Sequence, residues 1–193
     1  MGANVNNLFK SILRLGAIGL GLRAGAVRMS RLLSRLKPQG IDEPLVRIGP
    51  SADGGYLVPL TAREVDGVLS PGVGGSSAFE LTFAERGLPV VLVDPTVDGP
   101  AEPHPNFQFV PKALGTADDE LTITLANGAE MLDGRGNLLL QMDIEGAEWA
   151  VLLAATRKTL KQFRVMIIEF HEMDRLIRSQ QGFRRVQKVV KKL

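Results

Sequence analysis

Two short stretches of the sequence hold residue types that bind nucleoside cofactors. The segment Ser70–Ser77 reads Ser-Pro-Gly-Val-Gly-Gly-Ser-Ser, and Asp94 ends the apolar run Pro89–Val93, 22 residues after Gly72. In α/β proteins a glycine-rich turn lets backbone N–H groups approach a cofactor, and an acid at the tip of the next strand accepts hydrogen bonds from the ribose hydroxyls. The sequence therefore predicts a bound nucleoside cofactor.

A second group of polar residues follows two later apolar runs. Asp143 and Glu145 follow one run, and Glu169 and His171 stand at the end of the next. His171 titrates near neutral pH, so it can act as a general base, and we take His171 and Glu145 as the candidate catalytic residues. Two alternatives stay open. His171 could simply hydrogen-bond its neighbours, and the carboxylates could hold a divalent metal, which we do not favour.

The elements that must position these residues alternate between strand and helix. Apolar runs predict the main strands at 65–69, 90–94, 107–110, 138–143 and 165–170, and helices are predicted at 77–86, capped by Ser76 or Ser77, and at 148–160. Alternation of apolar and polar residues over 120–125 predicts a further, half-exposed strand. This order implies an α/β fold with a mostly parallel sheet and helices on both faces, in which ligands bind beyond the carboxyl ends of the strands.

Length and composition fit one ordinary α/β domain. The chain has 193 residues, of which 45% are hydrophobic, so it can bury a core. It has no cysteine, which excludes disulfides, thiolate zinc sites and a cysteine nucleophile. We expect a cytoplasmic location, with membrane association as a second expectation.

Positive charge is concentrated at the two ends of the chain. Seven basic residues precede the first acid, Asp42, and the remainder of the chain has 16 basic against 21 acidic residues. We expect no nucleic-acid partner, because the acidic body has no stripe of alternating basic and aromatic residues. The residues 183–193 predict a basic helix.

The basic N-terminal region, residues 1–40, is predicted to be an amphipathic segment separate from the α/β domain of residues 41–193. Its charge-free stretch Leu15–Leu22 is far shorter than the roughly 20 residues that cross a bilayer. A cationic amphipathic helix can lie on an anionic membrane surface, so we expect peripheral membrane contact through residues 1–37. The alternatives are a loosely ordered tail and a helix packed on the domain.

Two strings of residues resemble a known family. Residues 141–149 read Gln-Met-Asp-Ile-Glu-Gly-Ala-Glu-Trp, and residues 167–174 read Ile-Ile-Glu-Phe-His-Glu-Met-Asp. Both are similar to the FkbM family of S-adenosylmethionine-dependent methyltransferases, and the resemblance extends from about Val46 to Asp174. It includes the Asp53–Tyr56 turn and the glycine-rich segment.

The resemblance implies a Rossmann-like class I methyltransferase fold and S-adenosylmethionine as the cofactor. It implies that Asp94 holds the ribose, that Ala113 and Leu114 lie near the adenine, and that Asp143 faces the methionine moiety. The cofactor-binding residues that we predict are Gly72, Val73, Gly74, Gly75, Asp94, Pro95, Ala113, Leu114 and Asp143. The implied reaction is methylation of an oxygen of a sugar or another small hydroxylated metabolite, with His171 removing the proton of the acceptor.

The sequence departs from the family pattern in two places. Ser70 stands where many class I methyltransferases have an acid, and the family's last two strands have no counterpart after residue 170, so we expect a sheet that lacks its final strands. An alternative is therefore a non-catalytic, cofactor-binding or membrane-associated remnant of a methyltransferase. An NAD-dependent enzyme is less favoured, because Ser77 replaces the third glycine of the dinucleotide pattern.

Overall fold

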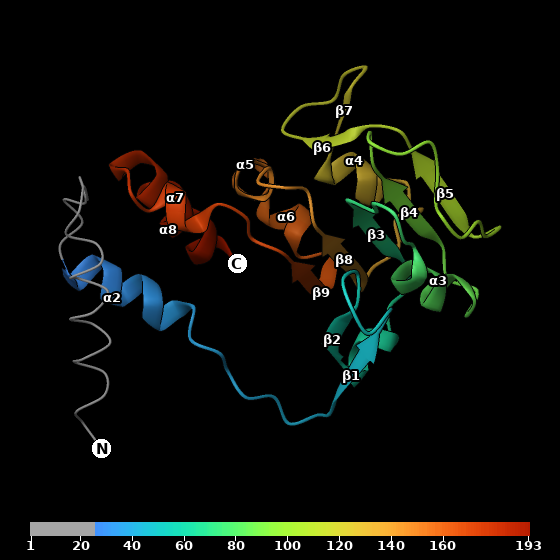
Figure 1. Ribbon diagram of the computed structural model, residues 1–193, viewed down its shortest axis with the longest axis horizontal. Helices are drawn as coiled ribbons and strands as arrows, with labels where there is room; N and C mark the ends of the chain where they lie inside the picture. The colour runs from blue at the N-terminus through green and yellow to red at the C-terminus, as the bar shows by residue number, and fades with distance from the viewer. Residues whose placement is uncertain (1–25) are drawn as a thin grey trace. The chain divides into compact units, whose positions relative to one another are not determined.

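The computed structural model describes residues 26–193, which divide into two compact units (Figure 1). One unit comprises Pro38–His171 with Lys192. The other comprises the described part of residues 1–37 with Glu172–Lys191 and Leu193. Because most of the predicted segment 1–40 lies outside the described residues, the predicted division into 1–40 and 41–193 stays a prediction.

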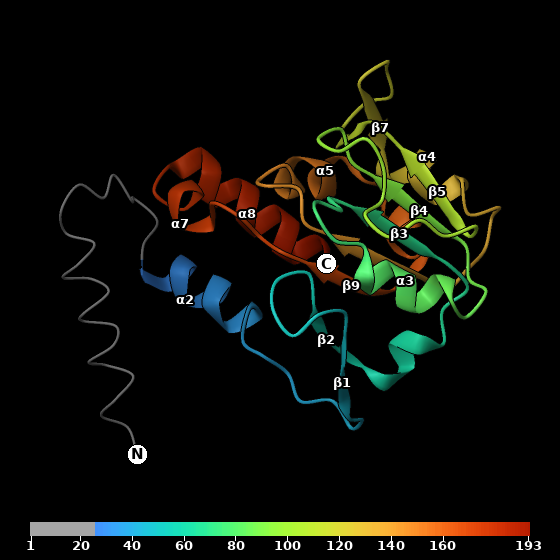
Figure 2. The same cartoon turned by 45° about the vertical axis from the view of Figure 1, so that its right-hand side comes forward.

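The larger unit is built on a five-stranded parallel sheet, which Figures 1 and 2 show from two sides. Its strands, in spatial order, are β5 (Phe107–Val110), β4 (Val90–Val93), β3 (Val68–Pro71), β8 (Leu138–Met142) and β9 (Phe163–Ile168). Every residue of β3, β4 and β8 is buried, as expected for parallel strands covered on both faces. The predicted α/β, Rossmann-like fold class is confirmed.

Helices cover both faces of this sheet. Val68 belongs to the core cluster that contains Phe79 and Phe83 of α3 (Ala78–Ala84). Leu69 points to the opposite face, because side chains alternate along a strand. There it packs on α4 (Leu125–Glu130), since a Cβ on Gly128 would lie 3.1 Å from Leu69 Cδ2.

Two small sheets and a short 3-10 helix complete the larger unit. They are the antiparallel pair β1 (Leu45–Ile48) and β2 (Tyr56–Pro59), the parallel pair β6 (Ala113–Gly115) and β7 (Thr122–Thr124), and η1 (Leu60–Arg63). The extra strand predicted at 120–125 is present as β7, outside the main sheet. It ends at Thr124, whose side chain accepts a hydrogen bond from Asn127 N and so begins α4.

Several predicted elements differ from the structure in their bounds. The strand predicted at 165–170 is β9, Phe163–Ile168, and the helix predicted at 77–86 is α3, Ala78–Ala84. The first main strand was predicted at 65–69, but β3 starts at Val68 and continues to Pro71. The helix predicted at 148–160 is two helices, α5 (Glu148–Ala154) and α6 (Arg157–Leu160). The break has a local cause, because Ala155 takes an extended conformation and Thr156 caps the second helix by accepting a hydrogen bond from Thr159 N.

The smaller unit contains three described helices. They are α2 (Ala26–Arg35), α7 (Met173–Leu176) and α8 (Gln180–Lys192). The predicted basic helix at the end of the chain is confirmed as α8. Among the described residues, no helix has the length and apolar character needed to cross a bilayer. The predicted membrane contact through residues 1–37 lies mainly outside the described residues.

Candidate functional site

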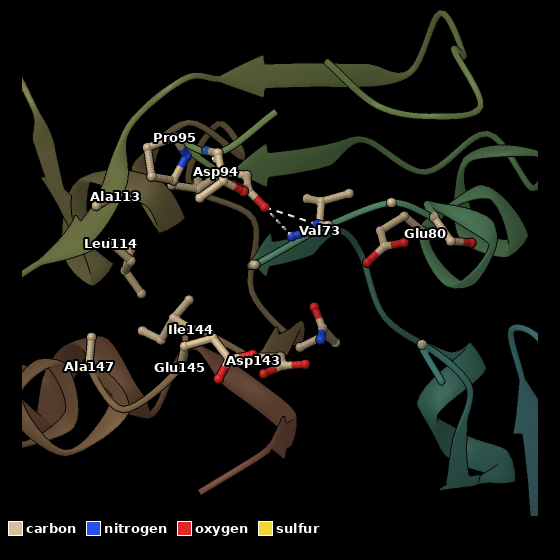
Figure 3. A pocket seen from close by; sticks show the side chains of 18 of the residues that line it. Val73, Glu80, Asp94, Pro95, Ala113, Leu114, Asp143, Ile144, Glu145 and Ala147 are labelled. Atoms are coloured by element: carbon tan, nitrogen blue, oxygen red, sulfur yellow. Dashed lines mark hydrogen bonds between the residues drawn. The ribbon is translucent and has the colours of Figure 1, made fainter. Parts of the chain in front are cut away.

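A cavity of about 560 Å³ opens at the carboxyl ends of β3, β4 and β8 (Figure 3). All nine predicted cofactor-binding residues line it: Gly72, Val73, Gly74, Gly75, Asp94, Pro95, Ala113, Leu114 and Asp143. The candidate catalytic residue Glu145 lines it as well. Residues that are up to 73 positions apart in the sequence, from Gly72 to Glu145, therefore meet in one cavity at the carboxyl edge of the sheet.

Among the glycines of the glycine-rich segment, Gly72 is the one that no residue with a side chain could replace without moving the backbone. This residue has φ +86°, and a Cβ there would lie only 1.6 Å from the carbonyl oxygen of Asp143. Only a residue without a side chain permits this approach of two strand ends. Gly74 and Gly75 differ, because a Cβ on either would meet no atom within 4 Å, which leaves their backbone open to a ligand.

The carboxylate of Asp94 fixes the conformation of the glycine-rich segment. Its Oδ2 accepts hydrogen bonds from the backbone N–H groups of Val73 and Gly74, each at 2.9 Å, and its Oδ1 accepts from N and Oγ1 of Thr96 (Figure 3). Burial favours the neutral acid, but these hydrogen bonds outweigh burial and lower the pKa of Asp94. A role for Asp94 in holding ribose stays a prediction, and positioning of the segment is a role that its contacts support directly.

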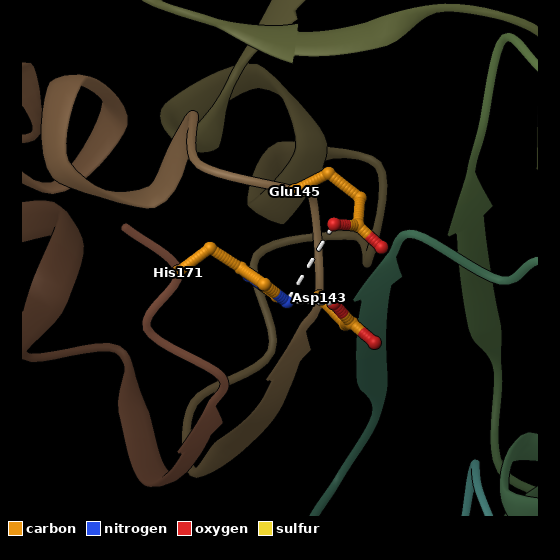
Figure 4. A group of neighbouring side chains, drawn as sticks. All are labelled: Asp143, Glu145 and His171. Atoms are coloured by element: carbon orange, nitrogen blue, oxygen red, sulfur yellow. Dashed lines mark ion pairs between the residues drawn. The ribbon is translucent and has the colours of Figure 1, made fainter. Parts of the chain in front are cut away.

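His171 and two carboxylates come together beside this cavity (Figure 4). Nε2 of His171 lies 3.5 Å from Oδ1 of Asp143 and 3.7 Å from Oε2 of Glu145. Glu145 has a left-handed backbone, with φ 53°, which is uncommon for a residue with a side chain and is often found at functional sites. The two candidate catalytic residues are thus neighbours in space.

Glu148 orients the ring of His171, a role that the sequence did not indicate. Its Oε1 lies 2.9 Å from Nδ1 of His171 and also accepts hydrogen bonds from the N–H groups of Ile144 and Gly146. The Glu148 side chain is fully buried. The hydrogen bond to Glu148 raises the pKa of His171 against the opposing effect of desolvation. Glu148 is the first residue of α5. An acid at that position is ordinarily explained by its favourable interaction with the helix dipole, so nothing in the sequence indicated its contact with His171.

Two buried side-chain oxygens of the described residues accept no hydrogen bond, Oδ1 of Asp143 and Oε2 of Glu148, and of these two residues Asp143 lines the cavity. Desolvation, followed by the nearby charge of Glu169, raises the pKa of Asp143. Such an oxygen suits a cationic group, either an ammonium group or a divalent metal ion. The ligand atoms of Asp143, Glu145 and His171 lie within 4.8 Å of one another, so these three residues are the ones that could hold a metal.

A buried polar chain forms another part of the cavity wall. Ser70 Oγ lies 2.5 Å from Oε1 of Glu80 and 2.6 Å from Oε1 of Gln141, and Gln141 Nε2 donates to the Tyr56 hydroxyl. Burial raises the pKa of Glu80. A hydroxyl has one hydrogen, so Ser70 can donate to only one of these oxygens; with Gln141 in this orientation, Ser70 donates to Gln141 and the contact with Glu80 is a hydrogen bond when Glu80 is protonated and donates. Glu80 thus brings a carboxyl group next to Ser70, the position at which we noted that many class I methyltransferases have an acid.

Known protein families provide an independent comparison with this geometry. Residues 102–185 match the Methyltransferase FkbM domain. The predicted family resemblance is thereby confirmed. No match was found among curated proteins or among solved structures.

The FkbM match covers one part of the site and not the other. It includes Ala113, Leu114, the Asp143–Glu145 loop and His171, and it begins after the glycine-rich segment and Asp94. For those earlier residues the assignment depends on the fold, which brings them into the same cavity. The match supports the predicted FkbM-type resemblance, and the parallel sheet agrees with the fold that the resemblance implies.

Proposed function

We propose that the protein is an S-adenosylmethionine-dependent methyltransferase that acts on an oxygen atom of a sugar or another small hydroxylated metabolite. The observation that carries the proposal is the convergence of nine predicted cofactor-binding residues on one cavity, with His171 at its side. The FkbM match supports methyl transfer as the reaction class.

The residues of the cavity fit this cofactor in three respects. Gly74 and Gly75 offer open backbone for close approach, and Ala113 and Leu114 offer apolar surface for an adenine ring. Oδ1 of Asp143, which is buried and accepts no hydrogen bond, would accept one from the ammonium group of the methionine moiety. When bound, the cofactor supplies an electrophilic methyl group, so the protein has mainly to align the acceptor and exclude water.

His171 would remove the proton of the acceptor hydroxyl. The carboxylate of Glu148 accepts a hydrogen bond from Nδ1–H, and this leaves the lone pair on Nε2, which faces Asp143 and Glu145. Nε2 takes up the proton, and the imidazolium that forms is stabilised by the three surrounding carboxylates. Because this polar group is assembled in full, a non-catalytic remnant is the less favoured alternative.

Calorimetric titration of the full chain with S-adenosylmethionine and with NAD tests the cofactor. We expect binding of S-adenosylmethionine and weaker or absent binding of NAD, and tighter binding of NAD would overturn the proposal. Incubation with a methyl-labelled donor and a pool of hydroxylated metabolites would then identify the acceptor. The His171→Gln variant is the control, because it should bind the cofactor normally and transfer label far more slowly.

A further inference from the structure

The smaller unit has a groove of about 330 Å³ lined by residues of both α2 and α8. Its lining comprises five cations and two other residues, namely Arg31, Arg35, Arg184, Lys188, Lys191, Leu32 and Gln187. All five cations are exposed, and the groove is lined by no acid. It therefore presents concentrated positive charge to solvent.

These cations have no carboxylate with which to pair inside their own unit. Residues 1–41 contain no acid, and the last acids of the chain are Glu172 and Asp174. Both of those acids form ion pairs elsewhere, Glu172 with Arg175 of α7 and Asp174 with Arg178, which follows α7. Among residues 26–193, none of the ion pairs involves a cation of the groove. A concentration of unpaired positive charge favours a ligand with several negative charges.

Apolar side chains on α2 and just beyond it indicate which kind of anion fits. Val27, Leu33 and Leu36 are 64%, 47% and 39% exposed. Exposed apolar residues beside a row of cations are typical of helices that lie at the surface of a bilayer, where the cations meet phosphate groups and the apolar side chains enter the acyl boundary. A soluble polyanion has no apolar region in which these side chains could be buried.

We propose that the groove between α2 and α8 binds the phosphate groups of an anionic lipid bilayer and attaches the protein to its surface. The predicted membrane contact through residues 1–37 is hereby extended to α8, which supplies three of the five groove cations. This attachment is independent of methyl transfer, so each can fail without the other.

Co-sedimentation of the full chain with vesicles tests the proposal. We expect binding to vesicles of equal parts phosphatidylcholine and phosphatidylglycerol, weakening as salt is added, and little binding to pure phosphatidylcholine vesicles. The double variants Arg31→Gln/Arg35→Gln and Lys188→Gln/Lys191→Gln should each weaken binding about 30-fold. The matched control is Lys158→Gln/Lys161→Gln, two exposed cations outside the groove, and it should bind like the wild type.

A second variant separates a lipid surface from a soluble polyanion. Leu33→Ser/Leu36→Ser should weaken vesicle binding about tenfold. Circular dichroism confirms folding of each variant, which we expect because the altered side chains are exposed. Three results would overturn the proposal: equal binding to neutral and anionic vesicles, groove variants that bind like the wild type, or tighter binding to a short RNA or to inorganic pyrophosphate than to anionic vesicles.

Discussion

Oε1 of the fully buried Glu148 lies 2.9 Å from Nδ1 of His171. This carboxylate raises the pKa of His171 above its usual 6.5, so the neutral imidazole, which is the form that accepts a proton, predominates only above the raised pKa. We predict that methyl transfer increases with pH through that value. Replacing Glu148 by Gln removes the charge, lowers the pKa of His171 and moves the acidic limb of the rate profile to lower pH.

Single-turnover rates measured across pH for the wild type and Glu148→Gln check this prediction. An acidic limb in the same place in both proteins would contradict the assignment of the base. The His171→Gln variant should lose about 10²- to 10⁴-fold in rate, the usual contribution of a general base. Its affinity for S-adenosylmethionine should be retained, which distinguishes a lost base from a collapsed cavity.

Replacement by alanine should lower the stability of the protein at Gly72 but not at Gly75. Gly72→Ala places a Cβ 1.6 Å from the Asp143 carbonyl oxygen at a left-handed backbone position, so we expect the free energy of unfolding to fall by about 3 kcal/mol or more. Gly75→Ala meets no atom within 4 Å and should retain stability. Urea denaturation compares the two, and equal stability would show that the strand ends can separate freely.

Asp94→Asn should loosen the glycine-rich segment. The amide cannot accept four hydrogen bonds, so we expect a loss of about 2 kcal/mol in the free energy of unfolding and weaker cofactor binding. The pKa of Asp94 is lowered, so its contribution to stability is present above the usual pKa of 3.8 and is lost as the pH falls below it. Denaturation at neutral and acidic pH measures this, with the exposed Asp98→Asn as the matched control.

Glu80→Gln should be tolerated where Glu80→Ala is not. An amide can donate to Ser70 as the protonated acid does, whereas alanine leaves a buried cavity and removes the hydrogen bond that Ser70 accepts. Because the pKa of Glu80 is raised above its usual 4.5, the wild type loses stability as the pH rises from 4.5 toward the raised value. Thermal melts over this range should show that loss in the wild type and not in Glu80→Gln.

Removal of divalent metal ions by a chelator should leave the rate of methyl transfer unchanged. We favour proton transfer over metal binding for Asp143, Glu145 and His171, although their ligand atoms lie close enough to hold an ion. The measurement is methyl transfer after treatment with EDTA, followed by addition of Mg²⁺ or Mn²⁺. Loss of activity that either ion restores would assign these side chains to a metal centre instead.

The sequence was sufficient to predict most of the sheet because its strands are continuous apolar runs. β5 has the predicted bounds, and β4 and β8 differ from them by one residue. The break between α5 and α6 was missed because Ala155 and Thr156 fit an apolar helical pattern equally well. What separates the helices is a capping hydrogen bond, which hydrophobic periodicity does not report.

The strand ends in the cavity lining, at Gly72, Asp94 and Asp143, could be predicted because parallel strands bring their carboxyl ends to one edge, whereas Ala113 and Leu114 were predicted from the family resemblance. The partners of those residues could not be predicted. Glu80 of α3 contacts Ser70 of β3, and Tyr56 of the β1–β2 hairpin contacts Gln141, which lies 85 residues later in the sequence. Such pairings depend on the packing of distant elements, and a polar Gln141 in an otherwise apolar strand was the only local sign of them.

Three strand ends are tied together at Pro71–Gly72. Gly72 N donates to Val93 O at 2.9 Å, and Asp143 N donates to Pro71 O at 3.1 Å. Backbone hydrogen bonds between strands therefore hold this part of the cavity wall, and none of these bonds involves Asp53 and Gly54, which the hairpin turn contributes to the lining. Under the proposed function, acceptors of different size would be accommodated on the side of that turn. Attempts to re-engineer the choice of acceptor should begin with that turn.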